Sequence, residues 1–275
     1  MSHHGAPEHD AHVDCPSQAD NSLDSCAIDP DLDANASADV AVMRAALGLQ
    51  TIVRYIGQRH WDEESSHARA ADQVEPGLKL ENVAAHSWQV ADATLLLAPH
   101  FPELSVARTV QLAILHDKLE LITGDYDPVG SDGRGTDSHA FDEYAQRQKR
   151  DAELSALEHY LRKVREPSRS IQKELLQDTI DGTTAEARFV KAIDKLQALV
   201  YVIEKKKGAM SDEHVDFSIR YTGKAIEYFP RLAAHCRVLF RDLLRSVANH
   251  RATCVCDVEA GLSPRAIDLL KRARP

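Results

Sequence analysis

The chain has 275 residues, 43% of them hydrophobic, which suits one domain of about 200 residues with appendages. A net charge of −10 disfavours nucleic acid or an anionic membrane as a partner, although a small anionic substrate stays open if a bound cation supplies local positive charge. Neither a run of 18 apolar residues nor a signal-peptide pattern is present, so we expect a cytoplasmic protein without a membrane span.

The five cysteines are odd in number and scattered along the chain: Cys15, Cys26, Cys236, Cys254 and Cys256. The last two have the spacing CxC rather than CxxC. This pattern argues against a disulfide framework and favours a reducing compartment.

The N-terminal third begins with a polar segment. Residues 1–37 contain almost no large apolar side chains, so we expect a disordered tail. Apolar residues at helical spacing from 38 to 57 predict an amphipathic helix. The polar residues 58–80 predict a long loop, which is either simply exposed or functional. Within it, Arg59 offers a guanidinium for phosphate and Trp61 a ring for stacking on a base.

Two apolar helices are predicted next, over residues 81–98 and 103–121. His86 lies one turn into the first, where a lone histidine is more often structural than a ligand. The second helix is nearly apolar all round in its C-terminal half, which predicts burial inside a helical bundle.

His116-Asp117 lie near the C-terminal end of that second helix and are followed by Glu120. Neighbouring side chains on a regular helix point about 100° apart, so His116 and Asp117 can share an ion only at a helix end or distortion. Gly124 supplies such an end. A buried carboxylate is costly unless it is paired or binds a cation. The pattern therefore indicates a metal site with Glu120 as a nearby acid/base group.

The remainder of the chain also reads as helical. Residues 124–140 predict a loop, in which most aspartates are turn formers. An apolar helix opened by a Thr184 cap contains Asp194, whose partner is Lys191, Lys195 or a metal. Further helices are expected at 140–163, 168–180, 211–227, 230–248 and 263–271. With no convincing strand pattern, the fold class is all-α.

The order His86, His116-Asp117, Asp194 resembles the H…HD…D signature of HD-domain metal-dependent phosphohydrolases, over roughly residues 40–230. The chain is most similar to the branch that acts as 5′-deoxynucleotidases. Three stretches carry the match: ENVAAHSWQVA from residue 81, LAILHDKLELITGD from residue 112 and AEARFVKAID from residue 185.

The resemblance implies a helical HD domain over residues 38–248, with residues 249–275 as a C-terminal extension. It implies a phosphomonoesterase of deoxynucleoside 5′-monophosphates or a related small phosphate ester. His86, His116, Asp117 and Asp194 would bind one divalent cation (Co²⁺, Mn²⁺, Zn²⁺ or Fe²⁺).

The same resemblance implies further roles. Glu120 would be the acid/base group, and Asp125 would orient the substrate. Arg59 would clamp phosphate and Trp61 would lie by the sugar or base. A homodimer is a further expectation by resemblance.

One departure from the family concerns Ala85, which stands where an acidic residue usually precedes the first histidine, so a contact that supports this ligand is missing or relocated. Two other functions stay open. One is a non-catalytic nucleotide-sensing module. The other is a di-iron oxygenase, which needs further histidines, with His60, His67, His100 and His139 as candidates.

Overall fold

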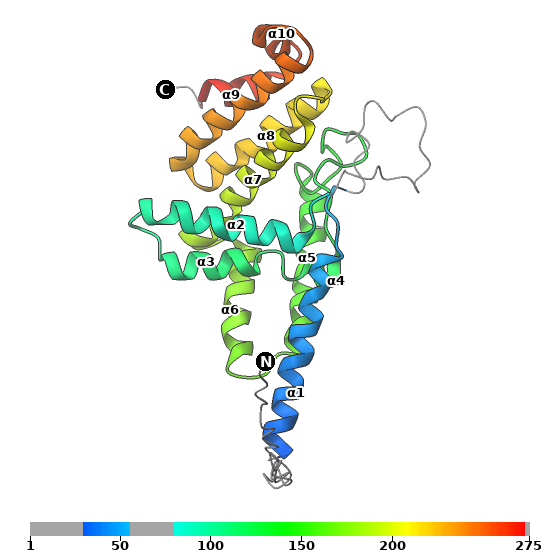
Figure 1. Ribbon diagram of the computed structural model, residues 1–275, viewed down its shortest axis with the longest axis vertical. Coiled ribbons are helices and arrows are strands. Elements are labelled where there is room, and N and C mark those ends of the chain that lie inside the picture. The colour runs from blue at the N-terminus through cyan, green and yellow to red at the C-terminus, as the bar shows by residue number, and fades with distance from the viewer. Residues whose placement is uncertain (1–29, 56–79, 273–275) are drawn as a thin grey trace, which may run out of the picture. The chain divides into compact units, whose positions relative to one another are not determined.

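The computed structural model describes residues 30–55 and 80–272. Its α-helices are α1 (Pro30–Ala46), α2 (Val83–Leu97), α3 (Val106–Leu115), α4 (Glu120–Thr123), α5 (Glu143–Leu161), α6 (Ser168–Asp181), α7 (Ala185–Lys206), α8 (Asp212–Tyr228), α9 (Ala233–His250), α10 (Val255–Ala260) and α11 (Pro264–Arg272) (Figure 1). One isolated bridge, between Val53 and Asn82, is the only β pairing in these ranges. The all-α prediction is confirmed. None of the described helices is long and apolar enough to cross a membrane.

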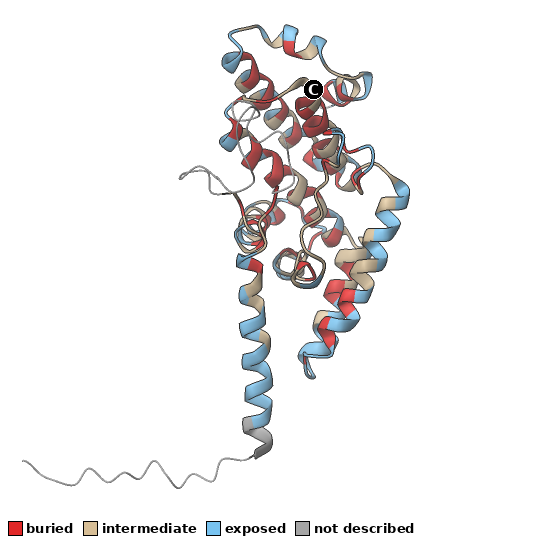
Figure 2. Ribbon diagram, turned by 90° about the vertical axis from the view of Figure 1, so that its right-hand side faces the viewer, coloured by how far each residue is buried: buried red, intermediate tan, exposed pale blue. Residues whose placement is uncertain are grey.

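Helix α7 is the central element of the unit that spans Ala38–Pro275. It contacts α2, α3, α6, α8 and α9, and α2 and α3 pack side by side against it (Figure 1). Its Phe189, Ile193 and Leu199 side chains are fully buried. Buried and exposed residues lie on different sides of the helices, as amphipathic helices require (Figure 2). The helix that carries Asp194 is thus held on several sides.

A second apolar cluster joins α5 and α6. Leu157 and Leu161 of α5 pack with Leu176 of α6 and with Leu119, which lies between α3 and α4. Helix α5 was expected at the surface, and Tyr144 near its start is exposed, whereas its C-terminal half is buried against α6. These contacts anchor the segment that follows His116 and Asp117.

The beginning of the described chain differs from the prediction. Helix α1 starts at Pro30, so residues 30–37 are helical where the tail was expected, and residues 1–29 lie outside the described residues. The helix ends at Ala46, well before residue 57, and the chain continues as a 3₁₀ turn over Leu47–Gln50. Met43, expected on an apolar face, is 69% exposed.

The helix predicted over residues 103–121 is broken in two. Ser105 caps the start of α3, which ends at Leu115, and α4 begins only at Glu120. Gly124 ends α4 with a φ of 73°, a conformation that glycine adopts without strain. Ile114 is 56% exposed, so the C-terminal half of α3 is buried on one side and not all round. The helix end that His116 and Asp117 need in order to share an ion was expected from Gly124. The structure supplies it earlier, because α3 ends at Leu115 and His116 is its C-terminal cap.

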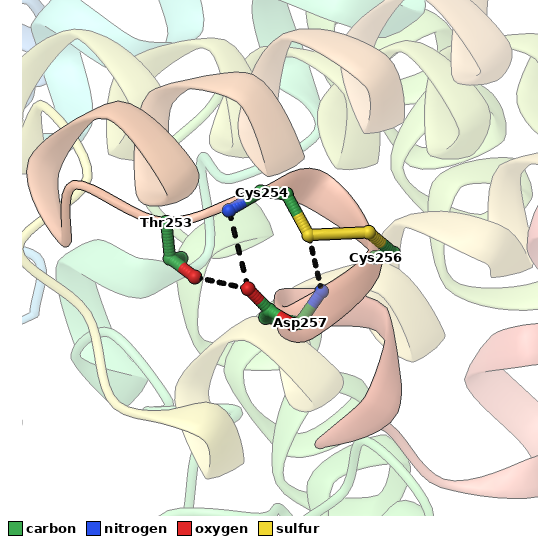
Figure 3. Close-up of a disulfide and its surroundings, with 4 residues drawn as sticks. All are labelled: Thr253, Cys254, Cys256 and Asp257. Atoms are coloured by element: carbon green, nitrogen blue, oxygen red, sulfur yellow. Dashed lines mark hydrogen bonds between the residues drawn. A yellow bond between two sulfur atoms is a disulfide. The ribbon is translucent and has the colours of Figure 1, made fainter.

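The C-terminal segment packs on the same core as the rest of the unit. Helices α10 and α11 contact α9, and α11 also contacts α8 through buried residues such as Leu269. Cys254 and Cys256 form a disulfide, which corrects the expectation drawn from their CxC spacing (Figure 3). Cys254 also caps α10, since its Sγ accepts the backbone N–H of Asp257 at 3.3 Å. The cysteine pattern therefore no longer supports the expectation of a reducing compartment.

Candidate metal centre

Three contacting helices bring the four expected ligands together. His86 lies in the first turns of α2, which Asn82 caps by accepting the Ala85 N–H at 2.9 Å. His116 and Asp117 follow the last residue of α3, and Asp194 lies in the middle of α7. Helices α2, α3 and α7 contact one another in pairs. The group of His86, His116, Asp117 and Asp194 is called the metal cluster below.

The metal cluster is centred on the Nε2 atom of His86. This atom lies 3.1 Å from Asp194 Oδ1, 3.4 Å from Asp117 Oδ2 and 3.2 Å from His116 Nε2. His116 Nε2 is in turn 3.2 Å from Asp117 Oδ2. The nearest ligand atoms of His86, His116 and Asp117 all lie within 4.8 Å of one another, so these side chains can hold one ion.

Both histidines are held by their other ring nitrogen. His86 Nδ1 is 2.6 Å from Oε1 of Gln197, and His116 Nδ1 is 2.7 Å from the carbonyl oxygen of Ala113. Because these oxygens only accept, each Nδ1 carries the hydrogen, and each Nε2 presents a lone pair to the cluster. Two imidazole lone pairs beside two carboxylates are a donor set that fits a divalent cation such as Zn²⁺, Mn²⁺, Co²⁺ or Fe²⁺.

The electrostatics of the cluster favour charged carboxylates. Burial alone would raise the pKa of Asp117, but the His116 and His86 rings outweigh it and hold that pKa well below its usual range. Conversely, Asp117 outweighs the effect of burial on His116 and raises the pKa of that imidazole. A cation would compete with this proton, so metal binding becomes weaker as pH falls.

Of the partners that the sequence left open for Asp194, the structure shows Lys195, and it leaves the other carboxylate oxygen facing the metal cluster. Its Oδ2 accepts a hydrogen bond from Lys195 Nζ at 2.6 Å, while its Oδ1 faces His86. Lys195 outweighs burial and lowers the pKa of Asp194 well below the ordinary value. Lys191 is bonded elsewhere, to the carbonyl oxygen of Ile180 at 3.0 Å.

Glu120 and Asp125 lie beside the cluster in different surroundings. Glu120 is buried, and its Oε2 has no hydrogen-bond partner among the residues that the structure describes. Burial, reinforced by Asp117 and Asp125, raises the pKa of Glu120 well above its usual value. Asp125 Oδ1 lies 3.7 Å from Arg54 Nε, and burial raises the pKa of Asp125 although Arg54 opposes the shift.

A buried polar network supports His86, and sequence reasoning missed most of it. Gln197 donates through Nε2 to Glu81 Oε1 at 2.8 Å, and Arg54 Nη1 donates to Glu81 Oε2 at 2.9 Å. Because Arg54 also faces Asp125, the network connects Asp125 with His86. Gln197 lies one helical turn after Asp194, a spacing that could have pointed to it.

The network also explains the departure at Ala85. Ala85 is exposed, so an acidic side chain there would not lie in the buried network. Gln197 holds His86 Nδ1 instead, and Glu81 Oε2 lies 3.6 Å from the same atom. The supporting contact is therefore relocated rather than missing.

Arg59 and Trp61 lie outside the described residues. Within them, Arg54 and Tyr55 offer the same pairing of guanidinium and aromatic ring a few positions earlier. Backbone hydrogen bonds from Arg54 N to Glu81 O at 2.8 Å and from Val83 N to Ile52 O at 3.0 Å fix Arg54 beside the start of α2. A search for any Arg-aromatic pair upstream of His86 would have found it.

A cavity of about 300 Å³ opens beside the metal cluster. His116, Asp117 and Asp194 are among the residues that line it, and five basic residues also contribute to the lining: Lys149, Arg150, Lys191, Lys195 and Lys224. Its volume is at the lower end of small-molecule sites. His139 also lines the cavity, whereas His100 is exposed, and His60 and His67 lie outside the described residues.

Comparison with known proteins identifies the class of protein. A model of the HD domain matches residues 66–232, more than half of the chain. The chain therefore belongs to the HD-domain family, and the resemblance seen in its motifs is confirmed.

The individual relatives share 30% or less of their aligned residues with this chain. The chain is 30% identical to the 5′-deoxynucleotidase HDDC2 of Xenopus laevis over 139 residues, which are 49% of this chain and 62% of that relative. It is 24% identical to the 5′-deoxynucleotidase hdd1 of Schizosaccharomyces pombe over 154 residues, 54% of this chain and 70% of the relative. The match thus spans slightly less than two thirds of the HDDC2 protein.

One solved structure shows the same fold. It is the crystal structure of a protein described as a predicted metal-dependent phosphohydrolase from Magnetospirillum magnetotacticum MS-1. The TM-score is 0.55 at 21% sequence identity, over 79% of this chain and 96% of the other. At this identity the likeness concerns the fold alone.

Proposed function

We propose that this chain is a metal-dependent phosphomonoesterase that hydrolyses a deoxynucleoside 5′-monophosphate, or a related small phosphate ester, to nucleoside and phosphate. The observation that carries the proposal is the convergence of the metal cluster, in which Nε2 of His86 lies within 3.4 Å of three other ligand atoms. The two relatives named as 5′-deoxynucleotidases support the substrate class.

The metal cluster would hold one divalent cation through the two imidazole nitrogens and the Asp117 and Asp194 carboxylates. Such an ion, when bound, polarises a phosphate group and lowers the pKa of a water molecule bound to it. Lys195 keeps Asp194 charged and Gln197 keeps the His86 ring in the ligating tautomer. The two aspartates would therefore bind the cation as anions, and the two histidines would bind it through neutral imidazole nitrogens.

Glu120 would be the acid/base group of the hydrolysis. Its unpartnered Oε2 is free to accept or donate a hydrogen bond, and the raised pKa makes both protonation states accessible nearer to neutral pH. Asp125, held by Arg54, would orient the substrate or the leaving oxygen. Arg59 and Trp61 keep the roles of phosphate clamp and neighbour of the sugar or base.

The same residues bear on the two alternative functions, a nucleotide-sensing module and a di-iron oxygenase. A nucleotide-sensing module needs no acid/base group, and a buried glutamate whose Oε2 has no hydrogen-bond partner in residues 30–55 and 80–272 is costly to retain for binding alone. A di-iron oxygenase needs more histidine ligands, and among the described histidines outside the metal cluster only His139 lines the cavity. Both observations favour the hydrolase.

The test is phosphate release from a panel of ribo- and deoxynucleoside monophosphates and non-nucleotide esters. Metal-stripped protein receives Co²⁺, Mn²⁺, Zn²⁺ or Mg²⁺ in turn. We expect release that requires metal and falls by about a thousandfold or more in Asp117→Ala, because several kcal/mol of transition-state stabilisation depend on the ion. Silence across the panel with one metal bound per chain would reject the phosphomonoesterase, and two metals per chain would favour the oxygenase.

The homodimer and the cytoplasmic location also remain proposals. An apolar groove of about 550 Å³ lies between α2, α7 and α9, with Val200 and Val238 partly exposed along it. A second copy covering this groove would bury both side chains. Analytical ultracentrifugation of the full chain should show a dimer that Val238→Glu converts to a monomer.

A further inference from the structure

Three arginines form a row along helix α9. Arg237, Arg241 and Arg245 are spaced four residues apart, so they lie on one face of the helix over about two turns. At 1.5 Å of rise per residue, this row is about 12 Å long. None of the three contributes to the lining of the cavity beside the metal cluster, so the proposed hydrolysis does not use them.

The row borders an apolar groove of about 380 Å³. All three arginines line this groove, and the other lining residues are Phe240 and Leu244 of α9, Val255 and Glu259 of α10, and Leu270 of α11. Phe240, Leu244 and Leu270 also belong to the main apolar core, so the groove has an apolar floor. We call this surface the arginine groove.

Two of these arginines lack a carboxylate partner. Arg237 and Arg245 form no ion pair with any residue in the described part of the chain. Arg241 Nε lies 3.3 Å from its neighbour Asp242, and exposed pairs of this kind contribute little. From α8 to α11, the other arginines each lie within 2.9 Å of a carboxylate: Arg220, Arg231, Arg251, Arg265 and Arg272.

Positive charge therefore predominates in the arginine groove of a chain whose net charge is −10. Glu259 is the one acidic residue in its described lining, against three arginines. Arg237 and Arg245 are half-buried, and Arg241 is exposed. Since an arginine can lay its methylene groups on apolar surface and keep its guanidinium in water, the groove combines apolar surface with accessible charge.

The groove is built on elements whose positions are fixed. Helix α9 contacts α7, α8, α10 and α11 (Figure 1). Val255 lies between Cys254 and Cys256, whose disulfide holds the start of α10 (Figure 3). A partner would therefore bind a surface that is already formed, which lowers the ordering cost of association.

We propose that the arginine groove is a docking site for an acidic amphipathic helix of a partner protein. Carboxylates at positions i, i+4 and i+8 of that helix would pair with the arginine row, and the apolar residues beside them would cover the groove floor. A single small anion cannot span a row of about 12 Å. The net charge of −10 opposes the broad attraction that nucleic acid or an anionic membrane requires.

The experiment is fluorescence anisotropy of labelled peptides titrated with the full chain. The probes are helical peptides of about 18 residues with Glu at i, i+4 and i+8 and with Leu, Phe or Trp beside these positions. We expect at least one to bind with a Kd below about 100 μM. Its counterpart with Gln in place of Glu should bind about tenfold more weakly, because three charge pairs are lost. Absence of binding by every acidic peptide would overturn the proposal.

Two matched variants locate the binding surface. The triple variant Arg237→Gln/Arg241→Gln/Arg245→Gln should weaken binding of the acidic peptide by about tenfold and bind the Gln peptide as the wild type does. The control Arg147→Gln/Arg162→Gln/Arg188→Gln removes the same charge from exposed positions outside the groove and should bind both peptides normally. Equal weakening in both triple variants would assign the effect to net charge and reject the docking site.

Other occupants of the groove would give different results. A change of oligomeric state in the groove variant, seen by sedimentation, would mean that a second copy covers this surface. Phosphatidylserine vesicles that displace the peptide would mean a membrane, and either outcome overturns the partner helix. If the triple variant loses its helical circular dichroism, Arg241→Glu, at an exposed position, carries the same comparison. None of these measurements depends on hydrolase activity.

Discussion

Two groups of side chains that line or adjoin the cavity differ in how they are held. On the metal side, His86 and His116 are each fixed by an oxygen acceptor, and Asp194 is fixed by Lys195. Lys191 and Lys224, which line the cavity and are called the cationic side here, are bonded only to backbone carbonyl oxygens within the described residues. The contacts of the metal cluster, called the metal side here, fix the orientation of its ligand side chains. The two lysines of the cationic side keep hydrogen-bond donors for a further acceptor.

This difference separates two kinds of experimental effect. Substitutions on the metal side should change metal affinity and turnover, since they alter ligand orientation or proton transfer. Substitutions on the cationic side should change binding of anionic ligands and its dependence on pH. The predictions below test this separation, beginning with the largest expected effect.

Glu120→Gln is the sharpest test of the metal side. It keeps the shape of the side chain and removes its acid/base function, so kcat should fall by about 10²- to 10⁴-fold. Metal content, measured by mass spectrometry, should match the wild type because Glu120 is outside the metal cluster. A variant that kept its turnover would refute the acid/base role, and one that lost its metal would make Glu120 a ligand.

Arg54→Met should damage the network behind the metal cluster. It leaves Glu81 and Asp125 without their cation in buried surroundings, where breaking such a pair costs about 3–5 kcal/mol. The free energy of unfolding from urea titration measures the loss. In Arg165→Met, which removes an exposed pair with Asp39, the midpoint should hardly move. Similar midpoints for both variants would show that the network is not structurally important.

The sequence predicted the metal cluster because its residues follow a pattern along the chain. His116 and Asp117 are adjacent, and both had to lie at a helix end to share an ion, which is where α3 stops. Asp194 stood out as a carboxylate inside an apolar helix. The all-α fold followed from helical periodicity, which local sequence largely determines.

The supporting network and the positions of Lys191 and Lys224 could not be predicted from spacing along the chain. Gln197 contacts His86 from 111 positions away, and Lys191 and Lys224 line one cavity only because α7 and α8 pack together. Arg54 was not considered, since periodicity placed it inside the helix expected over residues 38–57 and the turn at Arg54 was not foreseen. Such contacts depend on tertiary packing rather than on spacing.

Gln197→Leu tests whether the residues that hold the ligands affect metal affinity less than the ligands themselves. It removes the acceptor of the His86 Nδ1 hydrogen, so the ring can rotate or change tautomer. We expect metal affinity, measured by competition with a chelator, to fall by about 10- to 100-fold. Gln148→Leu, at an exposed position of α5, serves as the control. Unchanged metal affinity would mean that Gln197 does not orient the ligand.

The smallest expected effect concerns pH and the cationic side. Lys191, with its pKa lowered to about 8, loses its proton as pH rises through that value, and its attraction for an anion is lost with it. Glu153 and Asp181 oppose this shift, while Lys149 and Lys195 promote it. Phosphate affinity should therefore fall by about five- to tenfold between about pH 7 and pH 9.

The measurement is phosphate calorimetry across this pH range on the wild type and on Lys191→Gln. The ionisation of phosphate itself contributes equally to both proteins, so the difference between the two slopes isolates Lys191. The variant should bind phosphate more weakly at pH 7 and show a shallower decline, and the two proteins should converge near pH 9. Parallel declines would assign the pH dependence to another group and would leave the cationic side without a titrating lysine at this position.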